Sequence, residues 1–167
     1  MFGRISTPPA LAGPAPSGGE APDEALGRSQ GGFSTKLHLR VEGGGKPIIA
    51  VLTGGERHEQ IALEDLLDGG AIRRSGRGRP RLRPRRLAGD KGYSSPSARR
   101  RLRQRRISPV IPTRKDQRSQ PTFDRERNKV ERLINRLKQV RRIATRYEKR
   151  AANYLAMVNL GMIMLWL

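Results

Sequence analysis

Two acidic residues stand out because each lies among basic side chains. Asp90 is one of 2 acids in residues 73–118, a segment that also carries 18 Lys and Arg side chains. Glu131 lies in a sequence typical of a helix. The helical period of about 3.6 residues places four basic or amide residues near Glu131 on one face: Arg127, Asn135, Lys138 and Arg142.

Carboxylates among phosphate-binding cations suit chemistry with Mg²⁺ or Mn²⁺. These ions prefer oxygen ligands, and they stabilise both the attacking and the leaving oxygen of a phosphoryl displacement. For Glu131 the structural alternative is a surface ion-pair ladder with Arg127 and Lys138.

The sequence around Asp90 predicts a strand, a turn and a helix. Residues 86–89 (RLAG) form a short strand that ends at Asp90, and open α/β sheets place their ligands at such carboxyl ends. Ser94 or Ser95 can cap the helix that follows, with Pro96 in its first turn.

Two helices are predicted for the C-terminal part of the chain. The first runs from residue 124 to about 147 and the second over 151–167, after a brief strand at 110–112. Glu131 is expected on the exposed face of the first helix. The apolar residues expected to pack on a sheet are Val130, Leu133, Leu137, Val140 and Ala144.

The N-terminal half of the chain predicts a hairpin followed by a helix. Apolar and polar residues alternate over 35–41, glycines form a turn at 43–45, and residues 47–53 are largely apolar. His38 occupies a polar position of this alternation, so we expect its side chain to face solvent. Residues 58–67 predict a helix. Together these elements predict an α/β fold with a mixed sheet and flanking helices.

Composition divides the chain into an arm and one domain. Residues 1–32 are rich in Pro, Gly, Ala and Ser and have no apolar periodicity, so we expect a flexible arm. Residues 33–167 are expected to form a single domain with an arginine-rich loop at 73–86. A solvated charge run is the alternative interpretation of that loop.

His58 lies beside two glutamates in a loop, where we expect solvation rather than metal ligation.

The overall composition indicates a polyanionic partner. The 167 residues carry 35 Lys and Arg against 15 Asp and Glu, a net charge of +20 that attracts phosphates from a distance. The absence of cysteine excludes disulfides and thiolate-bound metals. No signal peptide is evident, and the longest apolar run, 160–167, is far shorter than the roughly 20 residues of a membrane span. We therefore expect a cytoplasmic, nucleoid-associated protein that binds double-stranded DNA and no membrane.

Three segments resemble the bacterial insertion-sequence transposases of the insertion-sequence-five group. They are residues 27–38 (GRSQGGFSTKLH), 89–93 (GDKGY) and 128–149 (NKVERLINRLKQVRRIATRYEK). The resemblance covers about residues 24–167. It implies a ribonuclease-H-like core and a DDE triad of carboxylates that binds Mg²⁺ or Mn²⁺.

The resemblance assigns roles to particular residues. Asp90 would be the second carboxylate of the triad and Glu131 the third, both as catalytic metal ligands. Arg127 and Lys138 fit the spacing of the family's glutamate-helix signature, whereas Asp124 stands where that signature has a tyrosine. The residues expected to contact DNA or to order the site are Arg127, Lys138, Asn135, Arg142 and Lys91.

The first carboxylate of the triad has no candidate in the expected place. In the family this Asp lies on a strand before the segment that corresponds to residues 27–32. Asp23 is the sole Asp in residues 1–26, and it lies in Pro- and Gly-rich sequence. We therefore expect that the first strand and its Asp are missing, that the chain is N-terminally truncated relative to the family, and that cleavage by this chain alone is impaired.

The expected function is transposition of DNA. The resemblance implies metal-dependent phosphodiester cleavage and strand transfer at insertion-sequence ends, with element ends and target DNA as partners and with self-association. Two alternatives stay open from the sequence. One is a non-catalytic DNA-binding remnant or regulator, and the other is a basic nucleic-acid packaging protein.

Overall fold

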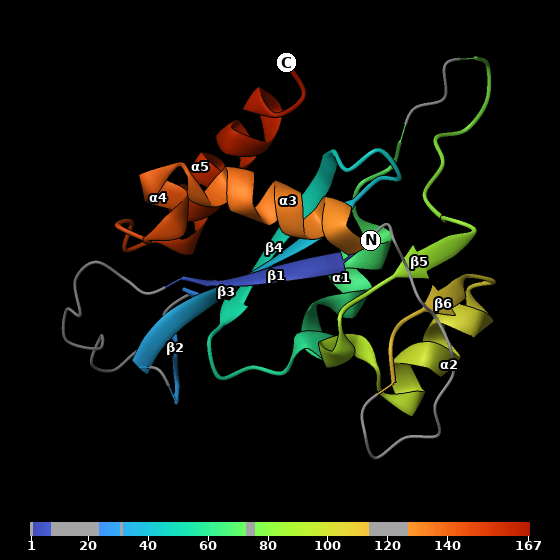
Figure 1. Cartoon of the computed structure of the whole chain (residues 1–167), viewed down its shortest axis with the longest axis horizontal. Coiled ribbons are helices and arrows are strands. Elements are labelled where there is room, and N and C mark those ends of the chain that lie inside the picture. The colour runs from blue at the N-terminus through green and yellow to red at the C-terminus, as the bar shows by residue number, and fades with distance from the viewer. Residues whose placement is uncertain (1, 8–23, 31, 73–75, 114–126) are drawn as a thin grey trace.

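The computed structural model describes residues 2–7, 24–30, 32–72, 76–113 and 127–167. Its strands are β1 (Phe2–Thr7), β2 (Gly27–Ser29), β3 (Gly32–Val41), β4 (Pro47–Gly54), β5 (Arg86–Ala88) and β6 (Ser108–Val110). Its helices are η1 (Glu59–Ala62), α1 (Leu63–Asp68), η2 (Lys91–Tyr93), α2 (Pro96–Gln104), α3 (Arg127–Lys138), α4 (Arg141–Ala144) and α5 (Ala151–Met164). Figure 1 shows α3 crossing the sheet of β1, β3 and β4, with β5, β6 and α2 beside it. The mixed α/β architecture predicted from the sequence is confirmed.

Strand β3 is the centre of the larger sheet. β1 and β4 both pair with it antiparallel over residues 35–40, so they occupy its opposite edges. β2 pairs with the first residues of β3, also antiparallel. The predicted hairpin of β3 and β4 is confirmed. Its turn closes with a hydrogen bond from the Glu42 N–H to the Lys46 carbonyl, and Gly45 adopts a φ of 95° that favours glycine.

The smaller sheet joins β5 and β6 in parallel, with α2 between them in the chain. Ser95 caps α2 by accepting a hydrogen bond from the Ala98 N–H at 3.1 Å, and Pro96 is the first residue of the helix. Both features were predicted from the sequence. The strand expected at 110–112 begins and ends two residues earlier, at Ser108–Val110.

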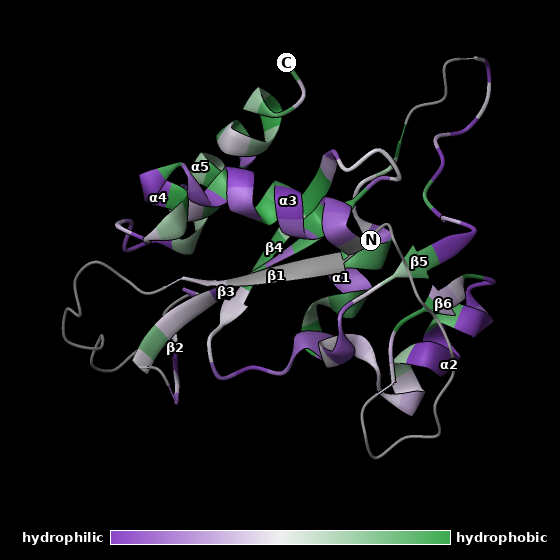
Figure 2. Cartoon of the chain, in the orientation of Figure 1, coloured by the Kyte–Doolittle hydropathy of each residue, from purple (hydrophilic) through white to green (hydrophobic). Residues whose placement is uncertain are grey.

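Two hydrophobic cores lie on opposite faces of β3 and β4. Side chains alternate between the faces of a strand, so Leu37 and Leu39 enter one core, and Ile49 and Val51 of the adjacent β4 pack against the other. The first core contains Val130, Leu133 and Leu137 of α3 with residues of α4 and α5. The second contains residues of α1, β5, η2 and α2, together with Ile107 and Ile111, which flank β6. Figure 2 shows apolar and polar residues alternating along α3, as a helix with one buried face requires.

The structure differs from the expectation that the first strand is missing. Residues 2–7 form β1 and pair with the edge of β3 in register from Phe2 opposite Arg40 to Thr7 opposite Thr35. An open strand edge presents unpaired backbone N–H and C=O groups, which an extended segment can satisfy almost irrespective of its sequence. Residues 8–23 of the expected arm lie outside the described residues.

The long helix predicted from residue 124 ends earlier than expected. α3 stops at Lys138, and Val140 has extended backbone before α4 begins. The last turn is tightened by hydrogen bonds from the Gln139 N–H to Arg136 and from the Val140 N–H to Leu137, a geometry common where α-helices end. Val140 is exposed, so its predicted packing on the sheet is wrong. Residues 124–126 lie outside the described part of the chain.

The end of α5 is fastened to the β3–β4 turn. The indole N–H of Trp166 donates to the Pro47 carbonyl at 2.8 Å, and the Lys46 ammonium donates to the Trp166 carbonyl at 3.2 Å. The same ammonium lies 4.7 Å from the centre of the indole ring, a cation–π contact. Of the helices in the described part of the chain, none combines the length and hydropathy that a membrane crossing requires.

Arg146 joins three parts of the chain through one buried guanidinium. The residue is 1% exposed, and it donates to the Thr35 hydroxyl and to carbonyls of two other segments of the chain. Burial lowers the pKa of Arg146. The backbone carbonyls that it bonds belong to Glu24, Ala25, Glu148 and Lys149.

Replacing this arginine tests whether it anchors the fold. Arg146→Leu leaves buried acceptors without a donor, so we expect the free energy of unfolding to fall by roughly 2–4 kcal/mol. Urea denaturation followed by circular dichroism measures the change. Arg150→Leu removes an equal charge from an exposed position and is expected to shift stability by less than about 0.5 kcal/mol. Equal effects of the two substitutions would contradict the anchoring role.

Candidate functional site

Asp90 lies at the carboxyl end of the parallel strand β5, as the sequence predicts, with Gly89 between them. It is the N-cap of η2, and its Oδ1 accepts a hydrogen bond from the Lys91 N–H at 2.5 Å. Asp90 is half-buried and Lys91 is exposed. Gly89 passes close to β6, because a Cβ there would lie 3.3 Å from Cγ1 of Ile111. The carboxylate is therefore held at the carboxyl end of a strand, on a tightly packed turn.

The turn after Asp90 is anchored to the larger sheet by buried hydrogen bonds. Tyr93 is fully buried, and its hydroxyl lies 2.9 Å from Nδ1 of His38 on β3. Nε2 of the same imidazole lies 2.9 Å from the hydroxyl of Thr53 on β4. Because each hydroxyl can donate or accept, a neutral imidazole satisfies both contacts in either tautomer.

The prediction that His38 faces solvent is wrong, since its side chain is 0% exposed. Alternation in β3 was expected to separate a buried face from a solvated one. The face of β3 that carries His38 is instead covered by the elements of the second hydrophobic core, which include the turn after Asp90. The polar side chains of this face find hydrogen-bond partners in those elements.

Glu59 is one of the two glutamates beside His58 that were expected in solvent, and the structure buries it. Its side chain is 10% exposed, and Oε1 lies 3.4 Å from the Lys36 ammonium. A Cβ at Gly92 would lie 3.0 Å from Cγ of Glu59, so this carboxylate lies against the turn that follows Asp90. The glycine at position 92 was the available signal, because its lack of a side chain admits a close neighbour. His58 is exposed and caps η1, with Nδ1 accepting from the Gln60 N–H at 3.3 Å.

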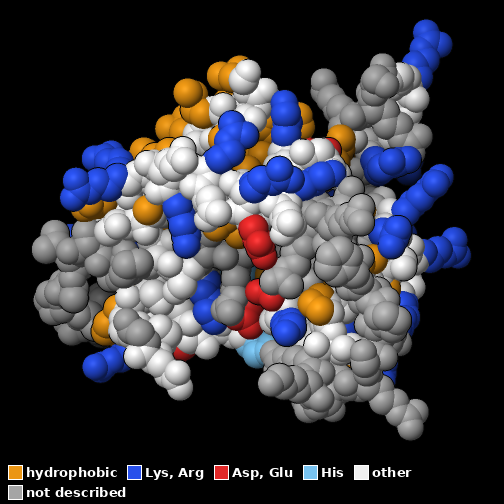
Figure 3. Space-filling model, in the orientation of Figure 1, with side chains coloured by type: hydrophobic (Ala, Val, Ile, Leu, Met, Phe, Trp, Pro, Cys, Tyr) orange, Lys and Arg blue, Asp and Glu red, His pale blue; other side chains and the backbone are white. Residues whose placement is uncertain are grey.

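Glu131 is exposed on α3, whose buried face is formed by Val130, Leu133 and Leu137. The predicted packing of these three apolar residues on the sheet is therefore confirmed. Asn135 is exposed on the same helix. Figure 3 shows a short column of acidic side chains in the middle of the face crossed by α3, with lysines and arginines around it and a histidine at its lower end.

The expected DNA-contacting residues do not all share one helix. Lys138 is the exposed last residue of α3, whereas Arg142 is exposed on α4, beyond the break in the helix. The expectation that Arg142 continues the face of Glu131 is therefore wrong. Arg127 is the first residue of α3, and its side chain lies outside the described part of the chain.

The carboxylates have the right donor chemistry for Mg²⁺ or Mn²⁺, which bind oxygen ligands. Within residues 2–7, 24–30, 32–72, 76–113 and 127–167, no three His, Cys, Asp or Glu residues are grouped so that they could hold a metal ion. Asp90 and Glu131 therefore do not amount to a full triad in the described residues.

Arg99 of α2 donates to the carbonyls of Ser94, Ile111 and Pro112, and the other five arginines of α2 and its flanks divide into two sets. Arg105 binds Glu64 and Asp68, and Arg101 binds Glu64, all at 2.5 Å, so that both tie α2 to α1. The hydrogen bond from Arg105 lowers the pKa of Asp68. Three further arginines are exposed, and the structure gives them no ion pair with a described residue: Arg100, Arg103 and Arg106.

Comparison with known proteins identifies the class. The family described as Transposase DDE domain matches residues 14–167 of this chain. The chain therefore belongs to the DDE transposases, and the resemblance seen in the sequence is confirmed. A putative transposase for insertion sequence element IS402 from Burkholderia cepacia is 36% identical over 127 residues, which are 76% of this chain. The match spans 60% of that relative's length. No solved structure matches the chain.

The anchor between His38 and Tyr93 can be tested by removing one oxygen. Tyr93→Phe keeps the buried ring and leaves Nδ1 of the imidazole without its partner. We expect the free energy of unfolding to fall by about 1–3 kcal/mol in urea denaturation. Tyr147→Phe removes a hydroxyl that bonds Arg141 at the surface, and it serves as the control with an expected change below about 0.5 kcal/mol. A Tyr93 variant as stable as the control would show that the buried bond anchors nothing.

Proposed function

We propose that this chain binds DNA at insertion-sequence ends as part of a transposase. The observation that carries the proposal is the position of Asp90, on a packed turn at the carboxyl end of a parallel strand, in a chain that belongs to the DDE transposases. The net charge of +20 supports a nucleic-acid partner. The proposal also includes cleavage of the element ends, strand transfer to target DNA, and self-association of the protein while it holds both ends.

The sheet topology supports a ribonuclease-H-like core for residues 33–167. β4, β3 and β1 form an antiparallel set in that order, and β5 and β6 form a parallel pair joined through a helix. In this proposal the two sheets are parts of one mixed sheet, with β1 added from the N-terminal residues. The basic loop of residues 73–86 extends from this core toward DNA. Residues 73–75 of the loop lie outside the described residues.

Asp90 and Glu131 are the proposed ligands of Mg²⁺ or Mn²⁺. Such an ion, when bound, stabilises negative charge on the phosphoryl oxygens during phosphodiester cleavage. Since no group of three candidate ligands lies within the described residues, we propose that this chain alone cleaves DNA poorly and that binding is its main activity. The same observation favours the second candidate function, a non-catalytic regulator that occupies element ends.

The proposed phosphate contacts come from the segments that carry these carboxylates and from α4. Lys91 follows Asp90 directly, and Asn135 and Lys138 lie on the helix of Glu131. Arg127 and Arg142 complete the set carried over from the family resemblance. Contacts of this kind position a protein on DNA without reading its sequence.

Neutralising each carboxylate separates metal binding from DNA binding. We expect Asp90→Asn and Glu131→Gln each to weaken Mn²⁺ binding at least about tenfold, measured by electron paramagnetic resonance, because each removes a charged oxygen ligand. Without metal, both variants are expected to bind DNA at least as tightly as the parent chain, since a repulsive charge is gone. Asp65→Asn changes an exposed acid on α1 and is the control. Metal binding unaffected by both substitutions would refute the assigned ligands.

The two sets of arginines on α2 predict different responses to salt. Replacing Arg100, Arg103 and Arg106 with Gln is expected to weaken duplex binding and to reduce the slope of log affinity against log salt by about 2.7, if each contacts one phosphate. Fluorescence anisotropy over a salt series measures this slope. Arg101→Gln with Arg105→Gln is the comparison, because these side chains bind Glu64 and Asp68. We expect that pair to lower stability and to leave the slope unchanged.

The comparison of DNA sequences distinguishes transposition from packaging. A protein of element ends prefers its terminal repeats over random duplex, whereas a packaging protein binds both alike. Competition with random DNA in the same anisotropy assay measures the ratio. Equal affinities would favour the packaging function that the composition alone left open.

A further inference from the structure

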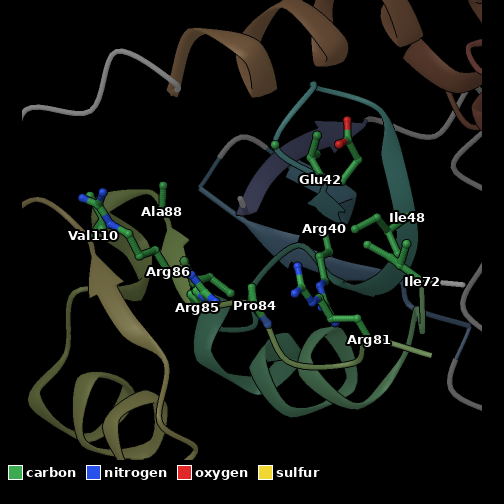
Figure 4. A pocket seen from close by; sticks show the side chains of 13 residues that line it. Arg40, Glu42, Ile48, Ile72, Arg81, Pro84, Arg85, Arg86, Ala88 and Val110 are labelled. Carbon is green, nitrogen blue, oxygen red and sulfur yellow. The ribbon is translucent and has the colours of Figure 1, made fainter. Parts of the chain in front are cut away.

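A cavity of about 460 Å³ lies between the β3–β4 hairpin and the strand that leads to Asp90. Its wall includes Leu87 and Ala88 of β5, the last residues of that strand before the turn. Figure 4 shows the lining residues on β3, β4, the 81–86 segment and β6, with Arg40 and Arg81 close together. The volume falls within the range of about 300–1,000 Å³ that is usual for small-ligand sites.

The cavity wall is strongly cationic. Four of its side chains are arginines, at positions 40, 81, 85 and 86, against the single acid Glu42. The carboxylate of Glu42 accepts the Lys46 N–H at 2.9 Å, and the nearby ammonium groups of Lys46 and Lys129 offset its charge. The remaining field in the cavity is therefore positive.

Arg40 is the fixed charge of this wall. It is 3% exposed, and its Nη1 donates to the carbonyls of Leu66, Leu67 and Gly69 at 2.9–3.2 Å. Nη2 donates to the Leu82 carbonyl at 2.7 Å. All four of these acceptors are neutral carbonyl oxygens, and among the described residues no carboxylate forms an ion pair with Arg40. A buried cation beside an open cavity attracts an anion, because the neutral carbonyls that it bonds do not offset its charge.

The rest of the wall is apolar. Ile48 and Ile72 line the cavity near Arg81, and Pro84 and Val110 line it beside β5. A ligand that combines an anionic group with a flat apolar part matches this division. A nucleotide has both, since its phosphate suits the arginines and its base suits the aliphatic wall.

We propose that this cavity binds one unpaired nucleotide of a DNA strand. The phosphate lies against the arginines and the base against the aliphatic wall. One nucleotide fits the volume of about 460 Å³. The inference rests on the proposed DNA-binding function and deepens it: the preferred substrate has unpaired nucleotides beside Asp90, since β5 forms the wall and carries that carboxylate at its end.

A pair of charge-matched variants tests the cavity. Arg81→Gln with Arg85→Gln removes two cations of the wall, and Arg77→Gln with Arg79→Gln removes two exposed cations of the same segment that do not line it. The probes are a blunt duplex and a duplex of equal length with three unpaired thymidines at one end. Fluorescence anisotropy gives the ratio of their affinities for the parent chain and for both variants.

We expect the parent chain to prefer the overhang roughly tenfold, in keeping with charged hydrogen bonds to one phosphate. The wall variant loses the preference. The control variant binds both probes more weakly and keeps it. No preference in the parent chain, or an equal loss in both variants, overturns the cavity assignment while duplex binding keeps the proposed function intact. Failure to bind either probe overturns both.

A competition experiment distinguishes a nucleotide within a DNA strand from a free nucleotide as the ligand of the cavity. Thymidine monophosphate at millimolar concentration is expected to remove the overhang preference without displacing the blunt duplex. That result supports the cavity and shows that it also accepts a free nucleotide. Persistence of the preference supports a site that recognises a nucleotide only within a strand.

Discussion

The buried polar face of β3 is the constraint on which this structure depends. A polar group removed from water must find a partner, because an unsatisfied one costs about 1–3 kcal/mol. On this face His38 is bonded to Tyr93, and Arg40 is bonded to the end of α1 and to Leu82. Lys36, two residues before His38, pairs with Glu59. Each of these three contacts holds a different segment against the sheet: the turn at Tyr93, the end of α1 with Leu82, and η1.

The consequence for the site is that Asp90 is positioned from a distance. The strand that carries it has three residues and pairs only with β6 among the described strands. Such a short parallel pair gives little rigidity by itself. The turn gains its definition from Tyr93, whose hydroxyl reaches the central strand, and from Gly92, which leaves room for Glu59. The position of Asp90 therefore depends on His38 and Glu59, which precede it by 52 and 31 positions.

Local patterns predicted the elements well where local physics decides them. The hairpin, the Ser95 cap and the apolar face of α3 follow from alternation, capping chemistry and helical period. The sequence also placed Asp90 at the end of a strand, and the family resemblance that it suggested is confirmed. The assignment of Asp90 and Glu131 as metal ligands stays a prediction.

The failures concern features that depend on distant partners. His38 was expected in solvent because alternation shows which side chains share a face of the strand. It does not show what covers each face. The burial of Glu59 was unforeseen for the same reason, since its neighbour Gly92 lies 33 positions away. β1 was unforeseen because its pairing is made by backbone atoms, which leave little trace in side-chain pattern. The end of α3 at Lys138 depends on backbone hydrogen bonds that apolar periodicity does not encode.

Trp166 gives the chain a built-in optical reporter. It is the one tryptophan in the sequence, and it lies at the junction where the end of α5 meets the β3–β4 turn. Its indole is half-exposed, with an ammonium over the ring and its N–H bonded to Pro47. Detachment of this helix end would transfer the indole to bulk water and shift its emission to longer wavelength. Fluorescence can therefore follow the docking of the C-terminal helix separately from the unfolding of the sheet.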